Sequence, residues 1–302
     1  MRLRPDMSRE ASPRAAIGIV GTGSVAQALG HLLYARGAPI VAVTSRTPSR
    51  AREAAAFIGP AVEVLPCAEF ARKVSRVLIA TSDAEITPAA ERLADAGLRH
   101  SVVLHTCGAR GPEALAPLRA SGNACGVCHP LQTFTDPQQG ADALTGAAFG
   151  ISGDGEARLW AEEIGAMLGG WTLPVDADSM AAYHAGAVMV SNSQPALIEG
   201  ALQAWALAGI DRSTALTALG PLSRRALDNA LRLGPEDALT GPVSRGDAAT
   251  VRAHVAALAS APAHVDNLYR AVAQTLLVLA RRRGLSEIQL QEIAGALDAG
   301  AD

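Results

Sequence analysis

The stretch IGIVGTGSVA, residues 17–26, decides how the rest of the sequence is interpreted. A short apolar run leads into Gly-x-Gly-x-x-Ala, and a helix-like segment follows. Gly21 permits a tight turn out of a strand, Gly23 lets the backbone approach a diphosphate, and Ala26 allows close packing of helix on strand. The free N–H groups and the dipole at the helix start favour the binding of an anion. The alternative is a glycine-rich turn between strand and helix that binds no ligand. The predicted dinucleotide contacts here are Gly21, Thr22, Gly23, Ser24 and Val25.

Length and composition bound the kind of protein. With 302 residues, of which 49% are hydrophobic, the chain is long for one core, and two domains are expected. The net charge of −3 gives no basic surface for nucleic acid or for an anionic membrane. No apolar run approaches the ~18 residues of a membrane span. Residues 1–15 are polar, without the apolar core of a secretory signal, so we expect a flexible tail and a cytoplasmic protein.

Hydrophobic patterning divides the remainder in two. Residues 16–176 alternate short apolar runs with helix-like segments, which is typical of a Rossmann-type doubly wound α/β sheet. Residues 177–302 lack strand signals and predict an all-helical domain. Pro195 is expected to kink or break the first of its helices. The expected strands are 16–20, 39–44, 62–64, 74–80, 101–105, 124–128, 147–152 and 171–175.

The segment after the second strand indicates which nucleotide is bound. Sites that prefer NAD usually place Asp or Glu there to bind the ribose hydroxyls. Here the residues are Ser45, Arg46 and Thr47, with Arg50 one turn further on. Arg46 offers a planar donor fork suited to a phosphate, and the hydroxyls of Ser45 and Thr47 add donors. The segment favours NADP over NAD; the alternative is that Arg46 is a solvated loop cation.

Two further strand ends are expected to face the cofactor, because ligands bind at the carboxyl ends of parallel strands. They are Ala80-Thr81-Ser82-Asp83 and His105-Thr106-Cys107-Gly108. Small and hydroxylic side chains suit the passage of a nicotinamide ribose. We therefore predict cofactor contacts at Thr81, Ser82 and Thr106, although a plain turn would look similar.

Two of the four cysteines, Cys125 and Cys128, lie in the sequence CGVCH. By residue spacing alone this sequence matches a haem-attachment or redox motif. The segment reads as a strand, in which residues three apart face opposite sides. The two sulfur atoms would then not meet, and buried neutral thiols are expected.

Several motifs together resemble a known family. They are GTGSVA at 21–26, Ser45-Arg46, HPLQTF at 129–134, YHAGA at 183–187 running to Ser191-Asn192, and LTGPVSRGD at 239–247. The chain resembles the bacterial Rossmann-like NADP oxidoreductases whose helical C-terminal domain has no assigned function. These are relatives of pyrroline-5-carboxylate reductase, ketopantoate reductase and the beta-hydroxyacid dehydrogenases. The resemblance implies a Rossmann domain, a helical dimerisation domain and an active site in the cleft between them, but no particular substrate.

Reduction of a C=O or C=N bond also needs a proton source. The related dehydrogenases commonly use a Lys and an Asn on the first long helix of the second domain. The only lysine here is Lys73, in the first domain, and His184 occupies the comparable region. On a helix, His184, Ser191 and Asn192 would share one face. We predict these three as catalytic residues, with packing and interhelical hydrogen bonds as the alternative.

Other polar residues have simpler explanations. His129 and His105 follow strands and could serve the site, but structural hydrogen bonds explain them as well. No histidine pair has metal-ligand spacing with a carboxylate, so no metal site is predicted. Asp247 would cap the helix after it, whereas Arg245 could reach an acidic substrate.

The sequence thus predicts an NADPH-dependent oxidoreductase that reduces a small carbonyl or imine substrate, and apolar stretches such as 271–280 suggest a homodimer. A non-catalytic NADP(H)-binding sensor or scaffold is the alternative from another class. Ketopantoate reductase itself, with His184 in place of the usual lysine, is the second enzyme alternative.

Overall fold

The computed structural model describes residues 15–299, so residues 1–14 of the predicted tail lie outside the described residues. Its contacts divide the chain into two compact units, the first ending at Ser191 and the second beginning at Asn192. The change from strands to helices comes earlier, since the last strand ends at Pro174 and helices follow from Ala177. Among residues 15–299, no helix combines the length and the apolar character needed to cross a membrane.

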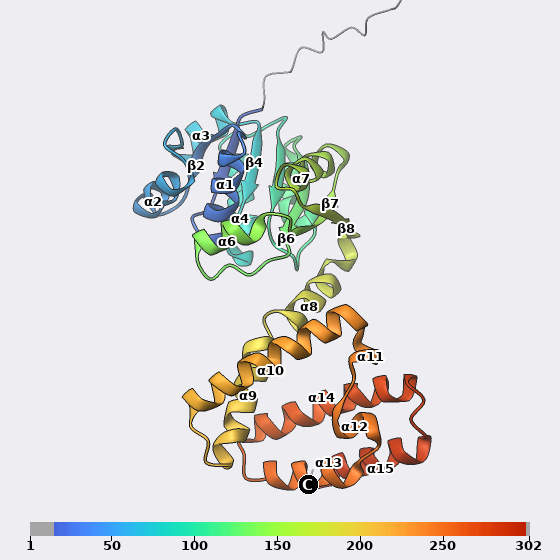
Figure 1. Ribbon diagram of the computed structural model, residues 1–302. Helices are drawn as coiled ribbons and strands as arrows, with labels where there is room; N and C mark the ends of the chain where they lie inside the picture. Colours follow the sequence, from blue (N-terminus) through green and yellow to red (C-terminus); the bar gives the residue numbers. More distant parts are fainter. Residues whose placement is uncertain (1–14, 300–302) are drawn as a thin grey trace, which may run out of the picture. The chain divides into compact units, whose positions relative to one another are not determined.

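The first unit contains one eight-stranded sheet in the order β3-β2-β1-β4-β5-β6-β7-β8 (Figure 1). All neighbouring strands are parallel except β6 and β7. The predicted α/β fold class and the eight predicted strands are confirmed, whereas the antiparallel pair was not foreseen. The strands are β1 (Ile17–Val20), β2 (Ile40–Thr44), β3 (Glu63–Val64), β4 (Arg76–Ile79), β5 (Val102–His105), β6 (Ala124–Pro130), β7 (Ala148–Gly153) and β8 (Trp171–Pro174).

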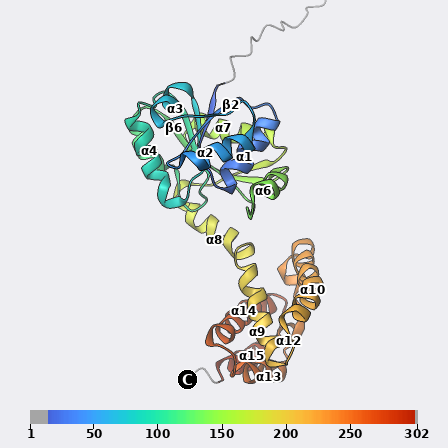
Figure 2. The same ribbon diagram turned by 90° about the vertical axis from the view of Figure 1, so that its left-hand side faces the viewer.

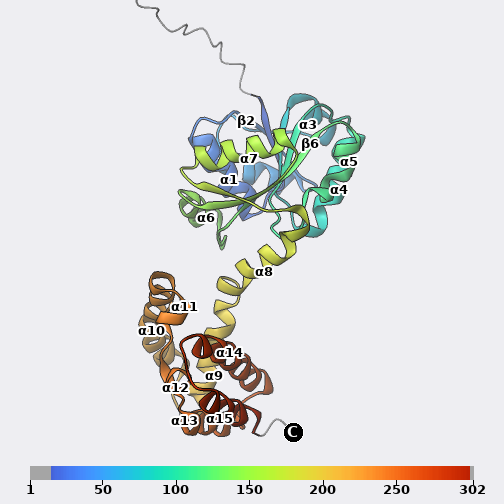
Figure 3. The ribbon, with the colours of Figure 1, turned by 90° about the vertical axis from the view of Figure 1, so that its right-hand side faces the viewer.

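Helices cover both faces of this sheet. Figure 2 shows α4 on one side and α1 and α6 on the other, and Figure 3 shows α4 together with α5. The helices are α1 (Ser24–Ala35), α2 (Pro48–Ile58), α3 (Cys67–Lys73), α4 (Ile86–Asp95), α5 (Ala116–Ala120), α6 (Pro137–Leu144), α7 (Gly155–Met167) and α8 (Met180–Val190). Short 3-10 turns lie at η1 (Asp83–Glu85), η2 (Pro112–Leu115) and η3 (Ala177–Ser179).

Alternating side chains of the central strands build a separate core on each face. Leu78 and Leu104 join the core beneath α1, α2 and α7, whereas Val77 and Val103 join the core beneath α3 and α4. Because both faces are buried, the strands are continuous apolar runs rather than alternating ones. This packing holds the carboxyl ends of β1, β2, β4 and β5 in fixed positions at one edge.

The second unit is entirely helical over its described residues. Its main core contains Val251, Val255, Ala273 and Ile293. The cap predicted at Asp247 is confirmed, and the side chains of Asp211, Asp247 and Ser286 each accept a backbone N–H of the helix that follows. Its helices are α9 (Gln194–Leu207), α10 (Arg212–Leu233), α11 (Pro235–Ala238), α12 (Gly241–Arg245), α13 (Ala248–Leu258), α14 (Ala263–Arg282) and α15 (Glu287–Asp298).

Candidate nucleotide-binding site

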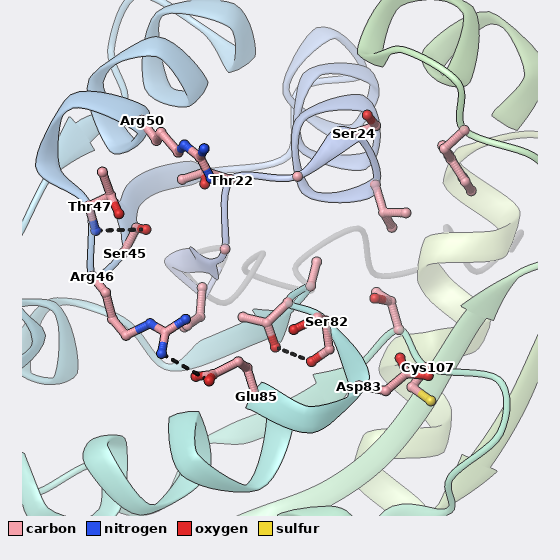
Figure 4. Close-up of a pocket in the computed structure, with 18 of the residues that line it drawn as sticks. Thr22, Ser24, Ser45, Arg46, Thr47, Arg50, Ser82, Asp83, Glu85 and Cys107 are labelled. Carbon is pink, nitrogen blue, oxygen red and sulfur yellow. Dashed lines mark hydrogen bonds and ion pairs between the residues drawn. The ribbon is translucent and has the colours of Figure 1, made fainter.

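A cavity of about 510 Å³ lies at the carboxyl ends of β1, β2, β4 and β5 (Figure 4). The structure brings all eleven residues predicted to contact the cofactor into its lining. They are Gly21, Thr22, Gly23, Ser24, Val25, Ser45, Arg46, Thr47, Thr81, Ser82 and Thr106. Parallel strands end at the same edge of a doubly wound sheet, which is why four separate segments of sequence converge there.

The two glycines of the first turn have different physical roles. Gly21 has φ +121°, and a Cβ at this position would collide with the carbonyl oxygen of Ala80. Gly23 has an ordinary φ of −74° and nothing within 4 Å of an added Cβ, so its missing side chain leaves open space. Gly23 is also the N-cap of α1, and no side chain caps the first turn of that helix. The turn therefore presents an uncapped helix start to the cavity, which suits an anion.

Cationic side chains line the end of the cavity beyond β2. Arg46 and Arg50 both reach it, and the Arg46 side chain is 65% exposed. The backbone N–H of Thr47 donates to Oγ of Ser45 at 3.3 Å, which shapes the loop. Figure 4 shows these side chains around the same opening. A phosphate here would meet guanidinium and hydroxyl donors, which is the chemistry predicted from the sequence.

Three lining residues were missed by the sequence analysis. Glu85 follows the β4 strand end and forms an ion pair with Arg46, with 2.9 Å between Oε1 and Nη1. Arg92 of α4 lies near the other carboxylate oxygen of Glu85, with 3.8 Å between Nη2 and Oε2. Phe134 enters from the loop between β6 and α6. Glu85 lies only three residues beyond Ser82, so the strand-end rule could have been extended to it.

His105 is a structural residue. It is fully buried, its Nε2 donates to the carbonyl of Gly111 at 3.0 Å, and its Nδ1 accepts the N–H of Cys107 at 3.3 Å. Burial lowers the pKa of His105, so the ring is neutral with both nitrogen atoms used.

A second polar cluster lies where β6 meets α8. Nδ1 of His129 is 2.9 Å from the hydroxyl of Tyr183, and the His129 and His184 rings meet edge to face with centroids 5.6 Å apart. Burial, with a smaller effect of His184, lowers the pKa of His129 to about 4, and burial raises the pKa of Tyr183 to about 12. The Tyr183 hydroxyl is therefore protonated and the His129 ring is neutral, and the two groups share a hydrogen bond.

This cluster contacts the loop that leaves β5. A Cβ on Gly108 would lie 2.6 Å from Cδ2 of His184 and 2.7 Å from Cε1 of His129, so both rings pack against that glycine. Thr106 and Cys107, just before Gly108, line the cavity. His184 thus lies in the first unit, next to a segment that reaches the predicted cofactor site.

The predicted helical face beyond His184 is interrupted. Helix α8 ends at Val190, residues 191–193 form a turn, and α9 begins at Gln194 with Pro195 in its first turn. Ser191 is still in helical register, because its N–H and its hydroxyl both donate to the carbonyl of Ala187. Asn192 lies past the end of α8 and is the first residue of the second unit, so helical spacing from His184 does not extend to it.

The cysteine interpretation is confirmed for β6. Cys125 belongs to the core on one face of the sheet and Cys128 to the core on the other. Both are unpaired and fully buried, and burial raises their pKa to about 11 and about 12. Within residues 15–299, no group of three or more His, Cys, Asp or Glu side chains is placed to hold a metal ion.

Comparisons with known proteins agree with this architecture. None of the curated proteins compared with the chain matches it. Among solved structures, it is similar to a protein from Bacteroides fragilis described as a candidate NADP oxidoreductase, with 23% identity, TM-score 0.71, and coverage of 87% of this chain and 97% of that one. An imine reductase from a Pseudomonas species has 19% identity and TM-score 0.63 over 94% of this chain and 100% of its own.

A reductive aminase from Aspergillus terreus, solved with NADPH and ethyl levulinate, has 15% identity and TM-score 0.59 over 96% of this chain and 94% of its own. At these identities the likeness concerns the fold. Residues 1–130 match the Rossmann-like domain, and residues 147–276 match a domain of unknown function, DUF2520. The chain therefore carries a Rossmann-like domain followed by a DUF2520 domain, which is the combination that its motifs resemble.

Proposed function

We propose that the protein is an NADPH-dependent oxidoreductase that reduces a small carbonyl or imine compound. The observation that carries the proposal is the convergence of the glycine turn, the uncapped start of α1 and the cations Arg46 and Arg50 on one cavity. Solved proteins of similar fold include one in complex with NADPH and one called an imine reductase, which supports this choice of cofactor and reaction.

The residues present fit the nucleotide. Gly23 leaves space beside the helix start for a diphosphate, and Arg46 with Ser45 and Thr47 provides donors for a 2′-phosphate. Thr81, Ser82 and Thr106 provide small polar surfaces at the ends of β4 and β5. When bound, NADPH supplies the hydride that the reduction requires.

The chain itself must supply the proton. We propose His184 for this role, with Ser191 and Asn192 as residues that orient the substrate. The contact of His184 with Gly108, two residues after Thr106, supports His184 most directly. Its neighbour His129 is neutral and bonded to Tyr183, so it is not a source of protons near neutral pH.

A nucleotide titration tests the binding part of the proposal. Quenching of tryptophan fluorescence by NADPH and by NADH should show tighter binding of NADPH. An Arg46→Ala variant should lose most of this preference, because the 2′-phosphate of NADPH then lacks the guanidinium N–H donors of Arg46. Equal affinity of the wild-type protein for both nucleotides would remove the role assigned to Arg46.

Turnover tests the catalytic part. Oxidation of NADPH with a panel of small ketones, ketoacids and cyclic imines should reveal activity, and His184→Ala should lower kcat by about 10²-fold or more. Full turnover by that variant would contradict the role of His184. Nucleotide binding without turnover on any substrate would favour a sensor or scaffold, and turnover confined to ketopantoate would identify a ketopantoate reductase.

A further inference from the structure

Glu85 engages the arginine that the proposed function assigns to the nucleotide phosphate. Its Oε1 is 2.9 Å from Nη1 of Arg46, and Figure 4 shows the two side chains pointing toward each other. Both residues line the cavity. The carboxylate therefore lies beside the guanidinium at the position where an acidic ligand would have to bind.

The second oxygen of Glu85 has unused bonding capacity. Oε2 is buried and has no hydrogen-bond donor among the described residues. It faces Arg92 at 3.8 Å, which is close enough for attraction between the charges but too long for a hydrogen bond. A small movement of the carboxylate toward Arg92 would satisfy this oxygen.

The existing ion pair is easy to open. The Arg46 side chain is 65% exposed on the loop between β2 and α2, whereas Glu85 is 27% exposed at the end of η1. Exposed pairs of this kind are weak, because water competes for both charges. Arg46 can thus exchange the Glu85 carboxylate for another anion at little cost.

We propose that Glu85 sets the preference of this cavity between 2′-phosphorylated and unphosphorylated nucleotides, and that its carboxylate transfers from Arg46 to Arg92 when a phosphate binds. The inference rests on the proposed NADP(H) site. A phosphate on Arg46 repels Glu85, and Arg92 neutralises the displaced carboxylate. When the bound nucleotide is NADH, which has no 2′-phosphate, its ribose hydroxyls donate hydrogen bonds to Glu85, as they do to the acidic residue of NAD sites. Glu85 therefore reduces the difference in affinity between NADPH and NADH that Arg46 creates.

Removing the charge of Glu85 tests the first part. Fluorescence titration of Glu85→Gln should show a two- to fivefold lower Kd for NADPH than the wild-type protein at low salt, roughly the strength of one exposed pair. The Kd for NADH should be unchanged or higher. The gain should shrink between about 50 mM and about 300 mM salt, because exposed charges are screened.

Glu91→Gln is the matched control. Glu91 is an exposed carboxylate of α4 outside the cavity lining, so its removal changes the net charge equally without touching Arg46. An unchanged or raised Kd for NADPH in Glu85→Gln, or an equal gain with Glu91→Gln, would overturn the inference while leaving wild-type binding intact. A wild-type protein that binds neither nucleotide would overturn the proposed function as well.

A double-mutant cycle tests the transfer to Arg92. Arg92→Gln alone should raise the Kd for NADPH about two- to fivefold, because Glu85 then has no second partner. In the Glu85→Gln background the same change should have no further effect. An equal loss in both backgrounds would mean that Arg92 contacts the nucleotide directly, and would overturn the transfer.

Discussion

Single residues in the first unit show how burial decides protonation. His129 and His105 are both held neutral by desolvation, and each has a hydrogen-bond partner that accommodates the neutral ring. Neither ring is poised to exchange protons near neutral pH. Their burial instead makes the stability of the first unit depend on pH, since the unfolded chain can protonate both rings.

His129 gives this dependence a definite range. Its pKa falls from 6.5 to about 4 on folding, so between these values the unfolded chain binds a proton that the folded protein does not. The contribution of His129 to stability should be constant above about pH 7 and decrease as the pH falls through this range, by up to about 3 kcal/mol. Urea unfolding followed by tryptophan fluorescence at pH 7, 6 and 5 would measure it. His129→Gln should show a shallower decrease, and a parallel decrease would contradict the assignment.

The two glycines of the first turn should separate stability from ligand binding. Gly21→Ala forces a side chain into φ +121° and against Ala80, so it should lower the free energy of unfolding by about 2 kcal/mol or more. The methyl group of Gly23→Ala would lie in open space, so this variant should change the free energy of unfolding by less than about 1 kcal/mol.

Gly23→Ala should instead weaken nucleotide binding roughly tenfold, or about 1.4 kcal/mol, because its methyl group projects into the cavity. Thermal unfolding with and without NADPH would compare the two variants. A Gly23→Ala protein with wild-type nucleotide affinity would show that the diphosphate does not approach this residue.

At the scale of elements, the motif at residues 239–247 forms a helix junction. Leu239 and Val243 are buried in the core of the second unit, Gly246 takes φ +72° at the end of α12, and Asp247 is the N-cap of α13. Arg245 is exposed. The motif is therefore explained by packing and capping, apart from Arg245.

Paired variants would separate these roles. Asp247→Ala should cost about 1 kcal/mol of stability, because Asp247 accepts the N–H of Thr250 at 3.0 Å and its hydroxyl at 2.6 Å. Arg245→Ala should leave the melting temperature within about 1 °C of wild type. If Arg245 reaches an acidic substrate, its removal should raise KM with little change in stability. Unchanged kinetics would leave Arg245 as a surface residue.

Local sequence patterns predicted most of the helices and strands, and the features that they did not predict have physical causes. The strands, the break before Pro195 and the three side-chain caps follow from apolar runs and from the chemistry of proline and short polar residues. Helices α3 and α6 are short and were not foreseen, since seven or eight residues give little periodicity. The Arg46–Glu85 pair depends on tertiary structure, because it joins residues that are far apart in the sequence.

At the scale of the whole molecule, the second unit offers an apolar face for association. Leu216, Leu227 and Leu231 lie eleven and four positions apart on α10, hence on one side of that helix, and are 46%, 44% and 78% exposed. In the predicted stretch 271–280, Ala273 and Ala280 are buried within the unit, and the exposed residues Val272 and Val278 are 39% and 48% exposed, less than Leu231. The leucine face of α10 is thus the stronger support for the proposed homodimer.

Leu231→Glu should convert a dimer into a monomer, because it places a charge on the leucine face that dimerisation would bury. Leu159→Glu is a suitable control, since Leu159 is 60% exposed on α7 in the first unit. Sedimentation velocity would measure both. A wild-type protein that sediments as a monomer, or a Leu231→Glu protein that stays dimeric, would exclude this face as the interface.

The margins of the sheet restrict how copies of this chain can meet. One outermost strand, β3, has two residues, and the other, β8, has four and ends at Pro174, which lacks an N–H. Such short borders offer few free backbone groups to a strand from another molecule, so they protect against edge-to-edge aggregation. We therefore expect copies of this protein to associate through side-chain packing between helices. The short edge strands disfavour the exchange of strands between copies.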